Sequence, residues 1–268
     1  MTGVNPSALR LDDVGAASKR YEVYGLTRVR LGPVTVPFPG NFLFLKYVPP
    51  VRRWGPYREL TAAQWERILE ALAGAGARMT VGVTAGWVEA DGRVVPYPRK
   101  FPAAAAVIRR GTESGLLEVA NHGYTHCVLD GRRFRPRLFS GNRTAHREFH
   151  EWLSSEVHLD HLARAQAILQ DFLGCAVVTF IPPGNVFTRD TLAAAVSTGL
   201  RYVSCLQPGR WGPFPGITFV EERDVTAIHD RDLVLGGLRV LSSLLESRGD
   251  PPFVTVREVG ARVEVAPR

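Results

Sequence analysis

The stretch that decides how this chain folds is Glu118-Val119-Ala120-Asn121-His122-Gly123-Tyr124-Thr125-His126-Cys127. Its apolar beginning predicts a strand, and Gly123 lets the backbone bend between two histidines that stand four positions apart. Neutral imidazole is the commonest metal ligand in proteins, and α/β folds present their chemistry at strand ends. Chance gives roughly 0.2 such pairs in a chain of this composition, so the pair indicates a metal site only with partners elsewhere.

Two adjacent carboxylates end an earlier predicted strand. Residues 8–15 alternate apolar and polar side chains before they reach Asp12, Asp13 and then a glycine. Adjacent residues of a strand point to opposite faces, so one carboxylate can face a metal while the other faces the space beside it. A turn or a helix cap is the alternative interpretation for such a pair when it stands alone.

Two more predicted strands end in polar or rigid segments. Residues 176–180 lead into Ile181-Pro182-Pro183-Gly184-Asn185, in which two prolines fix the backbone after the strand. Residues 225–228 lead into His229, for which a structural histidine beside a carboxylate is the alternative. Because the ends of parallel strands meet at one face of a β/α barrel, these distant segments are expected to supply a single site.

Taken together, these segments resemble the polysaccharide deacetylase (NodB-homology) superfamily. Residues 118–126 are similar to its metal-binding signature, and Arg10-Leu11-Asp12-Asp13-Val14 is similar to its first signature, Thr-Phe-Asp-Asp-Gly. The resemblance implies that Asp12 is the general base and that Asp13, His122 and His126 hold the metal. It also implies that the backbone N–H of Gly184 lines an oxyanion hole and that His229 is the catalytic acid.

One position departs from the family pattern. Ile181 stands where the third signature carries an arginine that orients the base and favours its charged form. We expect Asp12 to remain ionised at neutral pH but to be less firmly oriented than in relatives. An arginine from the loop 132–143 is a candidate to take the missing position.

The resemblance implies a distorted (β/α) barrel of about seven parallel strands, built by residues 1–268 as one catalytic domain. The strand–helix alternation agrees with it, and Thr61 with Gln64 forms a predicted capping box at a helix start. Residues 19–58 are rich in Pro, Gly and aromatic side chains and form a predicted insertion after the first strand. A substrate lid and a packing flap are equally open interpretations of this insertion.

A long amphipathic helix is predicted from about 144 to 173, and a helix over 234–246 and a strand over 253–256 are predicted to close the chain. The first helix carries a rival metal pair, His146 and His150, because residues four apart share a helix face. The order His-Arg-Glu-Phe-His differs from the His-Glu-x-x-His of zinc proteases. We therefore favour a solvated or substrate-facing segment over a metal site there.

Composition and charge indicate a globular protein with an anionic partner. The 268 residues are 45% hydrophobic and 22% charged, with a formal net charge of +7. The arginines are scattered and no nucleic-acid motif appears, so nucleic acid is not an expected partner. No signal peptide or transmembrane segment is predicted. The three cysteines have no paired spacing, which favours a reduced cytoplasmic setting, and Cys127 is predicted to be a small buried residue.

The implied reaction is hydrolysis of an N-acyl group, most simply acetyl, from an amino sugar or sugar conjugate. It requires one divalent metal ion, zinc by default, with Co²⁺, Mn²⁺ and Ni²⁺ as alternatives. The net charge favours a phosphate- or nucleotide-linked sugar, and we expect Trp87, Asn185 and Glu148 to contact it. A small-molecule amide hydrolase of the same superfamily and an inactive metal- or carbohydrate-binding relative remain open, and the oligomeric state is not predicted.

Overall fold

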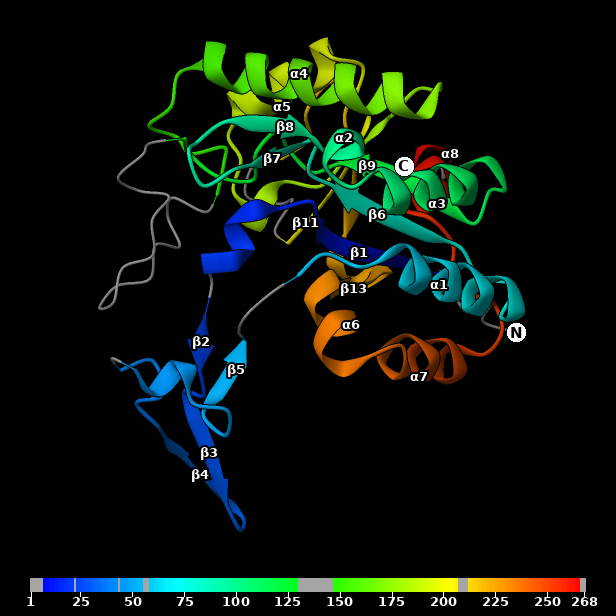
Figure 1. The fold of residues 1–268 in the computed structure, drawn as a ribbon. Coiled ribbons are helices and arrows are strands. Elements are labelled where there is room, and N and C mark those ends of the chain that lie inside the picture. The colour runs from blue at the N-terminus through cyan, green and yellow to red at the C-terminus, as the bar shows by residue number, and fades with distance from the viewer. Residues whose placement is uncertain are drawn as a thin grey trace.

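Seven parallel strands form one curled sheet in the computed structural model, which describes residues 7–21, 23–42, 44–54, 58–129, 147–206 and 212–265 (Figure 1). The strand order is β12-β11-β10-β9-β6-β1-β13, so β12 and β13 form the two edges of an open barrel. The strands are β1 (Ala8–Val14), β6 (Met79–Val83), β9 (Leu117–Asn121), β10 (Thr179–Phe180), β11 (Tyr202–Cys205), β12 (Thr218–Glu221) and β13 (Val225–His229). The predicted distorted barrel is confirmed.

Helices surround this sheet, and the main core lies between the two. The helices are α1 (Ala62–Gly74), α2 (Tyr97–Lys100), α3 (Pro102–Glu113), α4 (Ser155–Leu173), α5 (Arg189–Ser197), α6 (Asp230–Gly236), α7 (Arg239–Arg248) and α8 (Val256–Val265), with short 3-10 turns η1 (Ala17–Tyr21), η2 (Leu45–Tyr47), η4 (Pro183–Asn185) and η6 (Glu222–Asp224). Leu9 and Leu11 of β1 are buried in one core cluster with Trp65 of α1. Because side chains alternate along a strand, Arg10 and Asp12 point to the opposite, concave face of the sheet.

The capping box predicted at the start of α1 is present. The Thr61 hydroxyl accepts a hydrogen bond from the backbone N–H of Gln64, and the Gln64 side chain accepts one from the backbone N–H of Thr61. Two of the backbone donors that a helix start leaves without helical partners are thereby satisfied. The local sequence was sufficient to place this helix.

The predicted start of the long helix at 144 is wrong. Helix α4 begins at Ser155, and residues 147–154 precede it without helical structure, while residues 144–146 lie outside the described residues. Glu148 and Phe149 are both buried in this segment. Glu148 accepts backbone hydrogen bonds from the loop 124–126, and Phe149 packs edge-on against Phe180 and His158, so tertiary contacts fix this segment outside the helix.

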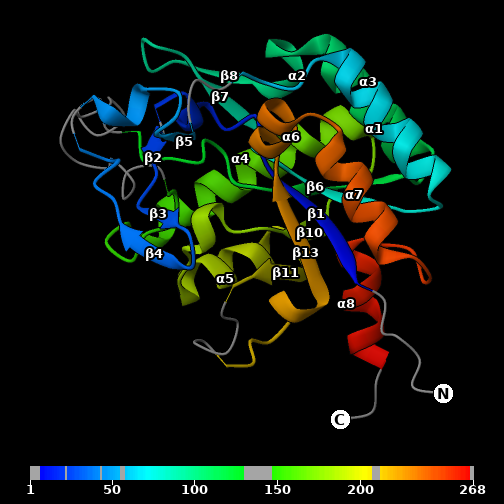
Figure 2. The same ribbon diagram turned by 90° about the horizontal axis from the view of Figure 1, so that it is seen from below.

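The end of the chain also differs from the prediction. Gly237, with φ of +70°, interrupts the predicted helix 234–246, so α6 and α7 are separate. Residues 253–256 contribute only an isolated bridge between Val254 and Ala8, and Val256 already begins α8. The Thr255 hydroxyl and the Glu258 carboxylate cap this helix by reciprocal hydrogen bonds with each other's backbone N–H groups. Helix α8 packs beside β12 and β1 (Figure 2).

The insertion forms small antiparallel units that project from the barrel (Figure 1). Its strands are β2 (Tyr24–Gly25), β3 (Arg28–Leu31), β4 (Val34–Pro37) and β5 (Arg52–Trp54), and a further hairpin beyond it joins β7 (Gly86–Val88) to β8 (Val94–Pro96). Among the described side chains of the insertion, none belongs to a hydrophobic core cluster. The substrate lid and the packing flap both stay predictions.

None of the helices in the described part of the chain combines the length and apolar character that crossing a bilayer requires. All three cysteines are free, and Cys127 is fully buried, as expected for a small core residue.

Candidate active site

Three predicted metal ligands come together at the carboxyl ends of β1 and β9. Oδ1 of Asp13 lies 3.2 Å from Nε2 of His122 and 3.1 Å from Nε2 of His126. All three side chains are buried, and their ligand atoms lie within 4.8 Å of one another. Among the described residues this is the one group of three or more His, Cys, Asp or Glu side chains with such spacing.

The hydrogen bonds of this group favour a cation at its centre. Nδ1 of His122 lies 2.7 Å from the carbonyl oxygen of Ile181, and because a carbonyl only accepts, Nδ1 carries the proton. With its proton on Nδ1, a neutral His122 would direct the lone pair of Nε2 towards the Asp13 carboxylate, which is itself an acceptor. Acceptors that face each other need a proton or a metal ion between them, so these side chains fit a divalent metal.

Asp13 has an unusual backbone that turns its side chain towards the histidines. Its φ of +72° lies in the left-handed region, and the β1–β6 register shifts between Leu11 and Val14. The ammonium of Lys19, itself buried, donates to the Asp13 carbonyl oxygen and also pairs with Asp230. Burial alone would raise the pKa of Asp13, but hydrogen bonds with the two histidines hold it well below its usual range, so the carboxylate is ionised.

Glu148 holds the loop that carries His126. Its Oε1 accepts from the backbone N–H of Tyr124 at 3.0 Å, and its Oε2 accepts from that of His126 at 2.9 Å. The N–H of Thr125 lies 3.2 Å from both oxygens, and Nδ1 of His161 lies 2.5 Å from Oε1. Glu148 is 1% exposed, so the expected substrate contact is not supported: its oxygens are occupied in fixing the metal-ligand loop.

Asp12, the predicted base, lies on the concave face of the sheet beside Arg10. Nη2 of Arg10 lies 2.8 Å from Oδ2 of Asp12, and both side chains are buried. Among the described residues, Oδ1 of Asp12 has no hydrogen-bond partner. The carboxylate is thus paired through one oxygen and available through the other.

His229 ends β13 next to the base. Its Cα is paired with that of Asp12 in the parallel β1–β13 ladder, which places the predicted acid and base on neighbouring strand ends. Nδ1 of His229 lies 3.7 Å from Oδ2 of Asp232. Burial would lower the pKa of His229, but Asp232, together with the charges of Asp13 and Asp12, raises it to about 9. In the metal-free protein this raised pKa favours the protonated imidazole at neutral pH, the form that a catalytic acid requires.

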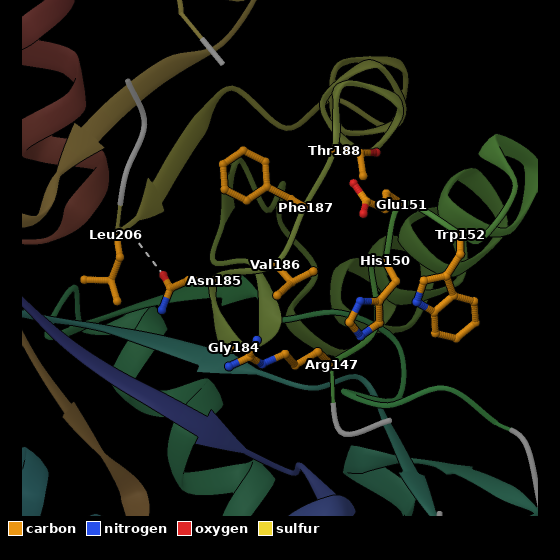
Figure 3. Close-up of a pocket in the computed structure, with 10 residues that line it drawn as sticks. All are labelled: Arg147, His150, Glu151, Trp152, Gly184, Asn185, Val186, Phe187, Thr188 and Leu206. Atoms are coloured by element: carbon orange, nitrogen blue, oxygen red, sulfur yellow. Dashed lines mark hydrogen bonds between the residues drawn. The ribbon is translucent and has the colours of Figure 1, made fainter. Parts of the chain in front are cut away.

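A pocket of about 490 Å³ lies between the segment before α4 and the residues that follow β10 (Figure 3), and its lining includes none of the metal ligands, Asp12 or His229. Gly184 and Asn185 line it, and the Arg147 side chain lies so close to Gly184 that a Cβ there would be 2.8 Å from the Arg147 Cγ. On another side, the ring of His150 is stacked on the indole of Trp152 at 5.1 Å between centroids, and Trp152 is 47% exposed. The pocket combines a cation, amide groups and an aromatic face.

The remaining predicted positions have structural roles. Trp87 is buried in a small apolar cluster with Cys127 and packs edge-on against Phe101 at 4.9 Å, so a substrate contact is not supported. Of the rival pair, His150 precedes α4, and its carbonyl accepts a hydrogen bond from Nε2 of His158 at 3.1 Å. His146 lies outside the described residues.

The sequence did not indicate that two buried cations, Arg10 and Lys19, organise the site. It indicated Glu148, but not its structural role. Arg10 had a readable signal, since it stands two positions before Asp12 and shares its face of the strand. Lys19 gave none, because it reaches Asp13 through a backbone turn that only the folded chain defines.

The family model for polysaccharide deacetylases matches residues 55–203. No curated protein matches the chain. Three similar solved structures each have a TM-score of 0.47. A CE4 family pseudoenzyme from Bacillus anthracis is 15% identical, and the match covers 75% of this chain and 61% of that one. A family 4 acetyl xylan esterase from Clostridium thermocellum in complex with a cobalt ion is 18% identical, with 78% of this chain and 89% of that one covered, and a putative polysaccharide deacetylase from Mycobacterium smegmatis is 14% identical, with 76% and 79% covered. The chain thus spans less than two thirds of the pseudoenzyme's length.

Proposed function

The chain belongs to the polysaccharide deacetylase family, and we propose that it is a metal-dependent hydrolase that removes an N-acyl group, most simply acetyl, from an amino sugar or sugar conjugate. The observation that carries the proposal is the convergence of Asp13, His122 and His126, whose acceptor atoms face one another in a buried site. Two imidazoles and one carboxylate are a donor set that suits zinc and leaves coordination positions open. When bound, a divalent ion supplies Lewis acidity towards a water molecule and the acyl oxygen.

The side chains around the metal ligands have complementary tasks in such a reaction. The free Oδ1 of Asp12 accepts a proton from the attacking water. The protonated imidazole of His229 donates a proton to the leaving amine, which would otherwise leave as a poor anionic group. The backbone N–H of Gly184 stabilises the negative charge that develops on the acyl oxygen. Acid and base stand on neighbouring strand ends, so both can act on one substrate.

The pocket lined by Arg147, Trp152 and Asn185 is the proposed position of the sugar. Trp152 offers an exposed aromatic face for the apolar side of a sugar ring, and Asn185 offers amide hydrogen bonds. Arg147 provides a cation for a phosphate or carboxylate on the substrate. The net charge of +7 also favours a substrate with an anionic group.

The test is turnover of N-acetylated amino sugars and their phosphate- and nucleotide-linked forms, with release of acetate as the readout. We expect activity that a chelator abolishes and zinc or cobalt restores. Asp13→Asn should lose both bound metal and activity, whereas Asp160→Asn, which alters an exposed carboxylate of α4, should keep both. Bound metal without turnover on any acyl sugar would favour the inactive binding protein, and turnover of small non-sugar amides alone would favour the amide hydrolase.

A further inference from the structure

A buried arginine crosses the inside of the barrel. Nη2 of Arg10 contacts Oδ2 of Asp12 at 2.8 Å, while its Nη1 donates to the Ser204 hydroxyl at 2.8 Å and to the Ser204 carbonyl at 3.2 Å. In the sheet, β10, β9 and β6 lie between β1 and β11, the strands that carry these residues. The guanidinium therefore spans the concave interior instead of pairing with a neighbouring strand.

Keeping this charge inside the barrel is costly without compensation. Arg10 is 5% exposed, and an arginine removed from water loses several kcal/mol of hydration. The Asp12 carboxylate and the two Ser204 oxygens replace that hydration at opposite ends of the guanidinium. The planar fork of arginine suits this arrangement, since it directs separate N–H groups to fixed positions.

The loop 132–143, the predicted source of a substitute arginine, lies outside the described residues, and position 181 itself offers no cation. Ile181, which follows β10, is buried, and its Cδ1 lies 3.2 Å from the point where a Cβ on Gly82 would stand. Gly82 belongs to β6, the strand next to β1, so an apolar side chain occupies this part of the barrel mouth. Within the described residues, the ion pair of Asp12 is with Arg10.

We infer that Arg10, anchored by Ser204, is the positioning residue for the base Asp12, in place of an arginine at position 181. The inference rests on the proposed function. Arg10 occupies Oδ2 and so fixes the carboxylate with Oδ1 free to accept the proton. The hydroxyl of Ser204 in turn holds the guanidinium beside Asp12, so β11 contributes to catalysis without touching the substrate.

The test compares Arg10→Met and Ser204→Ala with Arg109→Met, which removes an exposed arginine of α3. Arg10→Met should lower kcat about 10²-fold, within the range that a general base contributes, with KM and metal content unchanged. Ser204→Ala should give a smaller loss in kcat alone, and Arg109→Met none. The swap Arg10→Met/Ile181→Arg should restore kcat, which a purely structural arginine would not allow. Wild-type kcat in Arg10→Met would overturn the inference.

A second measurement separates this inference from the proposed function. The urea midpoints of Arg10→Met, Asp12→Asn and the double variant form a cycle that reports the coupling of the two side chains. We expect the double variant to lose clearly less than the sum of the single losses, because each single change leaves a buried charge unpaired. Additive losses would refute the pairing. If the wild-type protein has no turnover, the proposed function fails while this cycle still decides the inference.

Discussion

The carboxylate of Glu148 is the most informative position to perturb, because it connects the metal-ligand loop to the body of the protein. Glu148→Gln keeps the size of the side chain but replaces one acceptor oxygen by an amide NH₂. Both oxygens accept backbone N–H groups, from Tyr124 and Thr125 at Oε1 and from Thr125 and His126 at Oε2. In either orientation of the amide, an N–H group therefore meets an N–H group.

The expected loss follows from these contacts. A hydrogen bond to a charged group contributes about 1.5–3 kcal/mol, and a buried donor left without a partner costs about 1–3 kcal/mol. At least one backbone donor loses its partner, and the remaining bonds lose their charge assistance. We therefore expect the free energy of unfolding of the metal-free protein to fall by about 2–4 kcal/mol, out of the roughly 5–15 kcal/mol typical of a domain.

The same change should weaken metal binding, since the His126 backbone is fixed by Oε2 and has a φ of +59°. Groups that orient a metal ligand typically contribute about 10–100-fold in affinity. The assays are urea unfolding of the metal-free protein followed by circular dichroism, and competition with a chelator for zinc. Glu113→Gln, an exposed carboxylate of α3, is the control. A Glu148→Gln protein that matched this control in both assays would refute the assignment.

Three further predictions concern the acid, the base and the pocket. Because Asp232 and the nearby carboxylates outweigh burial and raise the pKa of His229 to about 9, the imidazole of the metal-free protein should lose its proton only as the pH rises towards that value, and Asp232→Asn should move this titration to lower pH when it is followed by NMR. Asp12→Asn should retain metal by elemental analysis yet lose kcat at least about 10²-fold, since an amide cannot accept the proton of water; equal loss of metal in Asp12→Asn and Asp13→Asn would contradict the division of roles. Trp152→Ala should raise KM for an N-acetyl sugar with metal content unchanged, and an unaltered KM would place the sugar outside this pocket.

The sequence by itself was sufficient for the strand ends that carry the chemistry. The Asp12–Asp13 pair, His122 and His229 each stand near the end of a largely apolar run, and His126 follows His122 by four positions; such a polar strand end is a local pattern. The structure brings these ends together because parallel strands of one sheet share a direction. The cap of α1 was equally local, since its donors and acceptors are three residues apart.

Tertiary structure alone decided which groups surround those residues. Glu148 holds the loop at Tyr124 and His126 through hydrogen bonds between residues 22 to 24 positions apart in the chain. These buried contacts outweighed the helical periodicity of the segment, so the helix begins later, at Ser155. The partner of Arg10 on β11 is 194 positions away, and it became close only when the sheet curled. Periodicity records which face of an element is apolar, but a buried charge is stabilised by whichever partner the fold brings within hydrogen-bond distance, and that partner has no fixed place in the sequence.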